Sequence, residues 1–269
     1  MRKYIYPFLT VILIVGLFYA EKYVDTQEEA YPDTTNEVVK PSSDEFDTSL
    51  LPSSTTNAVV HHTYFSLSYS EAHEQAEWVA YPLLKSHLSY NEFDRPKFVE
   101  DRSVSTKSAH WRSYKNSGYD RGHLCPAGDR RFSYEAYHET FLTSNISPQN
   151  HEFNSGVWNY LEKRTRYWAK KKEGVYVITG GVLTSDLPTI GIEKVAVPKY
   201  FYKIVMDASE GDTAAIAFLI PNEPTNKSYR DFVVPIDTIE TATGIDFFPK
   251  FSEEQQHALE STVRTTGWW

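Results

Sequence analysis

The stretch SGYDRGHLCPAGDRR, residues Ser117 to Arg131, carries an unusual density of reactive side chains. It holds three arginines, two aspartates, one histidine and the only cysteine of the 269-residue chain. The neutral imidazole of His123 is a suitable general base near pH 7. Gly122 permits a sharp turn or the close approach of a neighbouring segment. An ordinary charged surface turn, with Asp120 paired to Arg121, is the alternative interpretation.

The arginines of this stretch favour an anionic ligand. Arg121, Arg130 and Arg131 each offer a forked set of donors that matches the oxygens of a phosphate. Phosphodiester hydrolysis needs an activated water, charge stabilisation on the phosphoryl oxygens and help for the leaving oxygen. A histidine among arginines can supply the first two.

A long helix is predicted from Phe153 to Lys171. Within it Asn154, Trp158, Glu162 and Arg166 are four residues apart and form a slowly drifting stripe. In a regular helix Asn154 and Glu162 are about 12 Å apart along the axis and about 80° apart around it, too far to share one ion directly. One interpretation gives Asn154 the ion, Glu162 its water and Arg166 a phosphate. The other is an ordinary helix with an asparagine cap, a core tryptophan and a Glu–Arg pair.

Charge is unevenly distributed along the chain, whose formal net charge is −9. Residues 21–57 hold nine acidic and two basic residues. Residues 95–172 hold fifteen lysines and arginines against eight acids. A basic centre in an acidic protein suits a polyanionic substrate, although basic residues also simply solvate helix faces.

Three regions follow from this pattern. Residues 1–20 have Arg2 and Lys3 before an uncharged apolar run, which predicts an export signal or, because Phe18 suits cleavage poorly, an uncleaved membrane anchor. Residues 21–57 are predicted to be an acidic disordered linker, since they hold too little apolar area to fold. Residues 58–269 are predicted to form one domain outside the cytoplasm, anchored or released into the periplasm or medium.

The folded part has the pattern of an α+β protein with a mostly antiparallel sheet. Strands are predicted over 78–83, 174–183, 195–207 and 213–222, where β-branched and aromatic residues lie between turn formers. A short helix capped by Ser70 is expected before the first of these. Two further helices are expected near the end, one capped by Asp237 and closed by Gly244, the other beginning with Ser252 and Gln255 as a capping box.

The blocks SGYDRGHLCPAGDRRFS and TSNISPQNHEFNSGVWNYLEKRTR resemble the DNA/RNA non-specific endonuclease family, which includes endonuclease G. The segments FVEDRSV, VYVITGGVL, VAVPKYFYKIV and FLIPN fall in the same order and spacing, so the resemblance covers about residues 59–249. It implies a ββα-metal nuclease fold, one Mg²⁺ ion with Mn²⁺ as the alternative, and hydrolysis of both DNA and RNA with little sequence preference. A homodimer is possible, because dimers are common in this family.

The resemblance also implies roles for single residues. His123 matches the general base, Asn154 the single protein ligand of the metal and Glu162 the acid that orders metal-bound water. The remaining matches are phosphate-contacting or supporting residues: Arg166 and, less closely, Arg95 on the phosphate, Asp120 and Arg121 in the motif, and Asn145 near the site. Arg130 remains a candidate phosphate contact, and Cys125 has no assigned role.

Two other functions remain possible at this point. One is a nucleic-acid-binding or uptake protein on the same fold without catalysis. The other is a phosphodiesterase that acts on small nucleotides. The presence of His123, Asn154 and Glu162 together favours the endonuclease.

Overall fold

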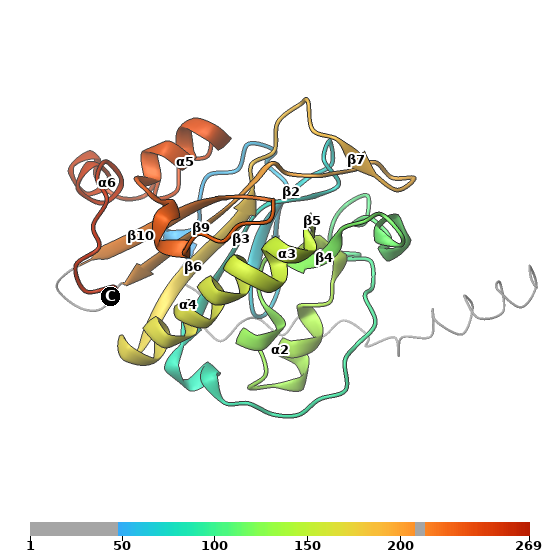
Figure 1. Ribbon diagram of the computed structural model, residues 1–269, viewed down its shortest axis with the longest axis horizontal. Helices are drawn as coiled ribbons and strands as arrows, with labels where there is room; N and C mark the ends of the chain where they lie inside the picture. The colour runs from blue at the N-terminus through green and yellow to red at the C-terminus, as the bar shows by residue number, and fades with distance from the viewer. Residues whose placement is uncertain (1–47, 208–212) are drawn as a thin grey trace, which may run out of the picture. The chain divides into compact units, whose positions relative to one another are not determined.

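The computed structural model describes residues 48–207 and 213–269, which are built around a seven-stranded sheet (Figure 1). Its strand order is β1-β2-β3-β6-β9-β10-β11, and all neighbouring strands are antiparallel. The strands are β1 Val59–His61, β2 Ser66–Ser70, β3 Gln75–Leu84, β6 Gly174–Gly181, β9 Tyr200–Asp207, β10 Ala214–Pro221 and β11 Val233–Val234. The predicted α+β class with a mostly antiparallel sheet is confirmed.

Two small ribbons and several helices complete the fold. The ribbons pair β4 Asp120–His123 with β5 Ile146–Gln149, and β7 Thr189–Ile190 with β8 Val195–Ala196. The α-helices are α2 Tyr134–Glu139, α3 His151–Phe153, α4 Asn159–Lys171, α5 Ile236–Thr243 and α6 Glu253–Glu260. Short 3₁₀ turns cover Thr48–Leu50, Lys85–Leu88, Trp111–Tyr114, Ala127–Asp129, Thr143–Asn145 and Tyr229–Phe232.

The central sheet is covered on both faces, as the alternation of side chains along each strand requires. In β6, Val175 and Val177 pack with Trp168 of α4, whereas Ile178 packs with Ile236 of α5. Figure 1 shows α4 crossing one face of the sheet, with α3 and the β4–β5 ribbon at its beginning. One of the two buried layers therefore packs α4 against the strands, and α4 carries part of the candidate site.

The predicted helix between Ser70 and Trp78 is wrong. The chain turns there from β2 into β3, and Ser70 Oγ bonds His73 Nδ1 at 2.8 Å, so the capping-type residue closes a turn instead. Glu74 has φ 53°, a value that ends any helix.

The two C-terminal helices match their predictions except at one cap. The first begins at Ile236 after Pro235, not at Asp237, and ends at Gly244 with φ 72°, as expected. Ser252 and Gln255 form the predicted capping box.

The long helix expected from Phe153 to Lys171 is not continuous. A π-helical segment, η6 Asn154–Trp158, lies between α3 and α4. Gly156 leaves the helical region with φ −96° and ψ −111°, and the Asn159 N–H donates to the Asn154 carbonyl five residues earlier. The separation of Asn154 and Glu162 that a regular helix predicts is therefore wrong. Glycine at position 156 permits the backbone conformation that interrupts the helix between them.

The predicted N-terminal anchor, residues 1–20, lies outside the described residues and stays a prediction. So does most of the predicted linker. None of the helices within 48–207 and 213–269 is long and apolar enough to cross a membrane.

The last residues of the predicted linker contact the folded domain. Residues 49–57 pack against the domain: Trp78 Nε1 donates to the Ser53 carbonyl at 2.9 Å, and the Thr55 N–H donates to Glu77 Oε1 at 3.0 Å. Thr55, a residue type typical of a linker, is here a hydrogen-bond partner of the buried Glu77, and such contacts extend the domain into the predicted linker.

Candidate active site

The candidate site is built where the β4–β5 ribbon meets the start of the π-interrupted helix. The Asp-Arg-Gly-His motif forms β4, with Asp120 opposite Gln149 and His123 opposite Ile146. Each ribbon strand is only four residues long, and Ser147 of β5 donates its hydroxyl to Gln75 Oε1 of β3 at 2.5 Å, which ties the ribbon to the central sheet. Two strands followed by a helix is the local arrangement that the resemblance implies.

His123 lies at the end of β4 in a mixed aromatic and cationic environment. Its ring centroid is 5.6 Å from that of Phe98 and 5.2 Å from that of Phe141. The half-buried ring has a shielded Nε2 that bonds to no other group in the described ranges. Burial, followed by the charges of Arg95 and Arg121, lowers the pKa of His123 to about 3. The imidazole is therefore neutral at physiological pH.

The two arginines near His123 are held by aromatic faces. The Arg121 guanidinium lies 4.8 Å from the Phe98 centroid, and that of Arg95 lies 5.8 Å from Phe98 and 5.7 Å from Phe141. Cation–π contacts of this kind orient a guanidinium without using its N–H donors. Both arginines can therefore offer donors to an anion beside the histidine.

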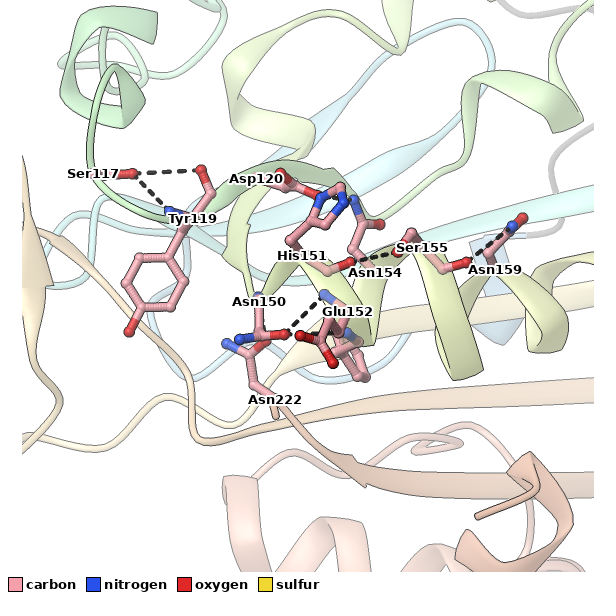
Figure 2. A network of polar contacts seen from close by, with 11 residues as sticks. Ser117, Tyr119, Asp120, Asn150, His151, Glu152, Asn154, Ser155, Asn159 and Asn222 are labelled. Carbon is pink, nitrogen blue, oxygen red and sulfur yellow. Dashed lines mark hydrogen bonds and ion pairs between the residues drawn. The ribbon is translucent and has the colours of Figure 1, made fainter. Parts of the chain in front are cut away.

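Asp120 fixes the orientation of Asn154. Asn154 Nδ2 donates to Asp120 Oδ2 at 2.9 Å, and His151 Nδ1 lies 2.9 Å from the same oxygen (Figure 2). A carboxylate only accepts, so it selects the nitrogen side of the Asn154 amide. The amide oxygen is thereby the atom that Asn154 presents to a ligand.

A second pair of asparagines holds the start of this helix. Asn150 Oδ1 accepts from the N–H groups of Glu152 and Phe153 as the N-cap of α3. The Asn150 N–H in turn donates to Asn222 Oδ1 at 2.8 Å (Figure 2), and Asn222 Nδ2 donates to the Pro148 and Pro198 carbonyls. Asn222, just past β10, thus ties the ribbon and the helix to the central sheet.

Arg166 is held by a buried aspartate. Arg166 Nη1 bonds Asp129 Oδ1 at 2.6 Å, and Tyr81 donates its hydroxyl to Asp129 Oδ2 at 3.0 Å. Asp129 is fully buried, whereas the Arg166 side chain remains partly exposed. The pair therefore anchors one side of the guanidinium, and the Arg166 side chain stays 25% exposed to solvent.

Lys203 of β9 places a second positive charge beneath the site. It is fully buried, donates to Thr179 Oγ1 at 2.6 Å, and lies 4.8 Å over the Trp158 ring. Burial lowers the pKa of Lys203, while the charges of Glu162 and Asp129 oppose that shift. Burial likewise raises the pKa of Glu162 to about 7, against the pull of Lys203. Glu162 is thus poised between its two protonation states near neutral pH.

Two predicted contacts with substrate are corrected by burial. Arg130 is 1% exposed, and its guanidinium donates to the carbonyls of Tyr64 and Pro82, so it is part of the core and cannot reach a phosphate. Asn145 is also buried: its Nδ2 donates to the Cys125 carbonyl and its Oδ1 accepts from the Cys125 N–H. Asn145 shapes the loop after His123, and Cys125 is a small buried residue within that loop.

The sequence prediction missed four supporting residues: Asp129, Lys203, His151 and Asn222. A lysine between Tyr202 and Ile204 in a strongly apolar strand was a usable signal, because an unpaired lysine is rarely buried. His151 and Asn222 gave no signal, since their partners lie far away in the sequence.

The described site can be compared with known proteins. The family model of the DNA/RNA non-specific endonucleases matches residues 42–254. The chain is 37% identical over 212 residues to "Nuclease EXOG, mitochondrial" of Danio rerio, covering 72% of this chain and 62% of that protein. It is 34% identical over 201 residues to "Endonuclease G, mitochondrial" of Homo sapiens, covering 69% and 67%.

Similarity extends to bacteria and to a solved structure. A protein named "Nuclease" from Nostoc sp. is 33% identical over 214 residues, covering 74% of this chain and 76% of that protein. The crystal structure of the EndoG/EndoGI complex aligns with a TM-score of 0.68 and 30% identity, over 73% of this chain and 88% of that chain. The alignments span about three fifths of the length of the EXOG proteins.

Proposed function

The chain belongs to the DNA/RNA non-specific endonuclease family, and from this premise we propose that it is a metal-dependent endonuclease that hydrolyses phosphodiester bonds in both DNA and RNA. The observation that carries the proposal is the neutral His123 imidazole beside Phe98, over whose ring the guanidinium groups of Arg95 and Arg121 lie. A base and two cations at one point match the needs of attack on a phosphodiester.

The metal that the family implies fits the residues at hand. Because Asp120 binds the amide nitrogen of Asn154, the neutral oxygen is free to ligate a hard cation. A single neutral protein ligand suits Mg²⁺, or Mn²⁺ in its place, since Mg²⁺ keeps most of its waters. When bound, such an ion stabilises negative charge on the phosphoryl group and the leaving oxygen.

The protein groups divide the remaining work. His123 takes the proton from the attacking water at its free ring nitrogen. Bound phosphate neutralises the neighbouring arginines, which raises the histidine pKa from its substrate-free value toward the range of an efficient base. Arg166 donates to the phosphoryl oxygens from the side that Asp129 leaves open, and Glu162 accepts hydrogen bonds from ordered water.

A nicking assay on the full chain tests this proposal. Supercoiled plasmid and a structured RNA are incubated with Mg²⁺, with Mn²⁺ or with EDTA. Both substrates are expected to be degraded with either metal and to survive in EDTA. His123→Ala is expected to lose at least about 10²-fold in rate, and near-wild-type cleavage by this variant would overturn the assignment of the base.

The same experiment separates the alternatives. Tight binding without turnover under any divalent ion would indicate a silent binding protein. Turnover of small nucleotide diesters without plasmid nicking would indicate a small-molecule phosphodiesterase.

We further propose that the domain acts outside the cytoplasm, tethered through residues 1–20. The support is the positive charge before the apolar run and the acidic sequence after it. Fractionation of cells tests the tether. Release of the nuclease from the membrane fraction by high salt would contradict it. Light scattering of the purified protein tests the possible homodimer.

A further inference from the structure

A groove of about 860 Å³ runs between α4 and the segment 225–229, beside the candidate site. Its walls are Tyr160, Lys163, Arg164 and Tyr167 of α4, facing Lys227 and Tyr229. Figure 1 shows the orange segment after β10 running next to α4. Its volume is near the upper end of clefts that hold a small ligand, which is too little for a duplex and enough for a short length of one strand.

The groove is positively charged in a negatively charged protein. Lys163, Arg164 and Lys227 line it, and no acidic residue is among the described residues of its walls. The whole chain has a formal net charge of −9. A concave surface that collects cations against this average favours an anionic occupant.

Aromatic rings in the groove are open to solvent. Tyr160 is 63% exposed and Tyr167 is 50% exposed. Lys163 Nζ lies 5.5 Å from the Tyr160 ring, and the Arg164 guanidinium lies 4.9 Å from the Tyr167 ring. Arg164 Nε also donates to the Tyr229 hydroxyl at 2.9 Å, which joins the two walls. Exposed rings next to cations are the combination that proteins use to bind unpaired nucleotides.

The groove and the candidate site occupy two flanks of one helix. Tyr160, Lys163 and Tyr167 lie on one stripe of α4, and Glu162 and Arg166 lie roughly 130° around the axis. The groove reaches the helix beginning at Gly156, two residues after Asn154. A strand bound near Asn154 can therefore continue into the groove.

We propose that this groove binds an unpaired stretch of the nucleic-acid strand next to the bond that is cut. The inference rests on the proposed function and deepens it. Bases stack on Tyr160 and Tyr167, while Lys163 and Lys227 contact phosphates. An acidic protein segment would neutralise the lysines, but its carboxylates would not stack on the exposed rings of Tyr160 and Tyr167.

Fluorescence anisotropy with the full-length protein in EDTA tests the groove without cleavage. The probes are a labelled single-stranded oligonucleotide and a blunt hairpin duplex. Tyr160→Ala/Tyr167→Ala is expected to weaken single-strand binding by about fivefold or more for each tyrosine. Lys163→Gln/Lys227→Gln is expected to reduce the salt slope of log K by about 1.4. Both effects should be smaller on the duplex.

Tyr90→Ala is the matched control. Tyr90 is 70% exposed and has a guanidinium 4.6 Å over its ring, that of Arg131, yet it lies outside the groove. It is expected to bind as wild type does. Single-strand affinities within twofold of wild type for both double variants would overturn the inference, as would equal losses on the duplex. Thermal melts of each variant confirm folding.

Failure of the inference is distinct from failure of the proposed function. A wild-type protein that binds through the groove but nicks no substrate would contradict only the endonuclease assignment. A wild type that nicks plasmid, with tyrosine variants that bind unchanged, would contradict only the groove.

Discussion

Replacing Gly122 with alanine should damage the site through a single steric overlap. A β carbon at this position would lie 2.1 Å from both Cδ and Oε1 of Gln149 and 2.5 Å from its Cγ. Carbon atoms in contact are normally about 3.5–4.0 Å apart. Gly122 has an ordinary negative φ, so the glycine is required by space and not by backbone conformation.

The structure leaves Gln149 little room to yield. Its side chain is fully buried in β5, directly behind Gly122 and opposite Asp120. Overpacking of this kind costs about 1–3 kcal/mol, and we expect Gly122→Ala to lose that much free energy of unfolding. Because His123 is the next residue, displacement of β4 should also lower kcat by at least about tenfold.

A double-mutant cycle identifies the cause. Gln149→Ala removes all three overlapping atoms, and the Gln149 amide has no hydrogen-bond partner in the described ranges, so its loss is tolerable. Gly122→Ala/Gln149→Ala should therefore be more stable than Gly122→Ala, with a coupling of about 1–2 kcal/mol. Urea unfolding, monitored by tryptophan fluorescence, measures the free energy of unfolding of the wild type, the two single variants and the double variant. A plasmid-nicking time course measures kcat.

A matched glycine controls for the loss of glycine itself. Gly174 in β6 would place its new β carbon 3.1 Å from a Leu84 methyl, which can rotate away. Gly174→Ala should cost less than about 1 kcal/mol. Strict additivity of Gly122→Ala and Gln149→Ala would refute the steric explanation.

Three further predictions concern the charges around the site. Asp120→Ala frees the Asn154 amide, and the Mg²⁺ concentration for half-maximal nicking should rise about 10- to 100-fold; an unchanged metal requirement would contradict the orienting role. In EDTA, Glu162→Gln should gain stability over wild type as the pH rises from about 4.5 to above 7, because a folded-state pKa of about 7 makes the wild type lose stability over that window. Parallel curves of urea midpoint against pH would contradict the raised pKa of Glu162. Asp129→Asn leaves Arg166 without its anionic partner and should lower the free energy of unfolding by about 3 kcal/mol and reduce nicking, whereas a stable, fully active variant would show that the pair is dispensable.

The local residue pattern was enough to predict the strands β3, β6, β9 and β10, because each is a run of β-branched and aromatic residues bounded by turn formers. His123 and Asp120 lie on one short strand, and the buried runs of β6, β9 and β10 follow from residue type alone. The relation of Asp120 to Asn154 could not be obtained this way, since a hydrogen bond across 34 residues depends on the pairing of β4 with β5.

Burial was the property that sequence predicted least well. Arg130 and Arg131 are adjacent and chemically identical, yet Arg130 is enclosed by the core while Arg131 lies over Tyr90. Glycine-associated departures from regular geometry were also missed, because the residue pattern around Gly156 is compatible with an uninterrupted helix. Both errors arise from tertiary packing that overrides local preference.

The π-helical segment η6 changes the angle around the helix axis between the side chains before it and those after it. In an uninterrupted α-helix, each residue fixes the direction of every later side chain at 100° intervals. The wide turn at Gly156 breaks that dependence, so the direction of Asn154 and that of Glu162 and Arg166 can be set separately. Evolution of such a chain can therefore change the direction of the proposed metal ligand Asn154 without changing that of Glu162 and Arg166. Insertions or deletions between residues 154 and 158 are the changes that would do so.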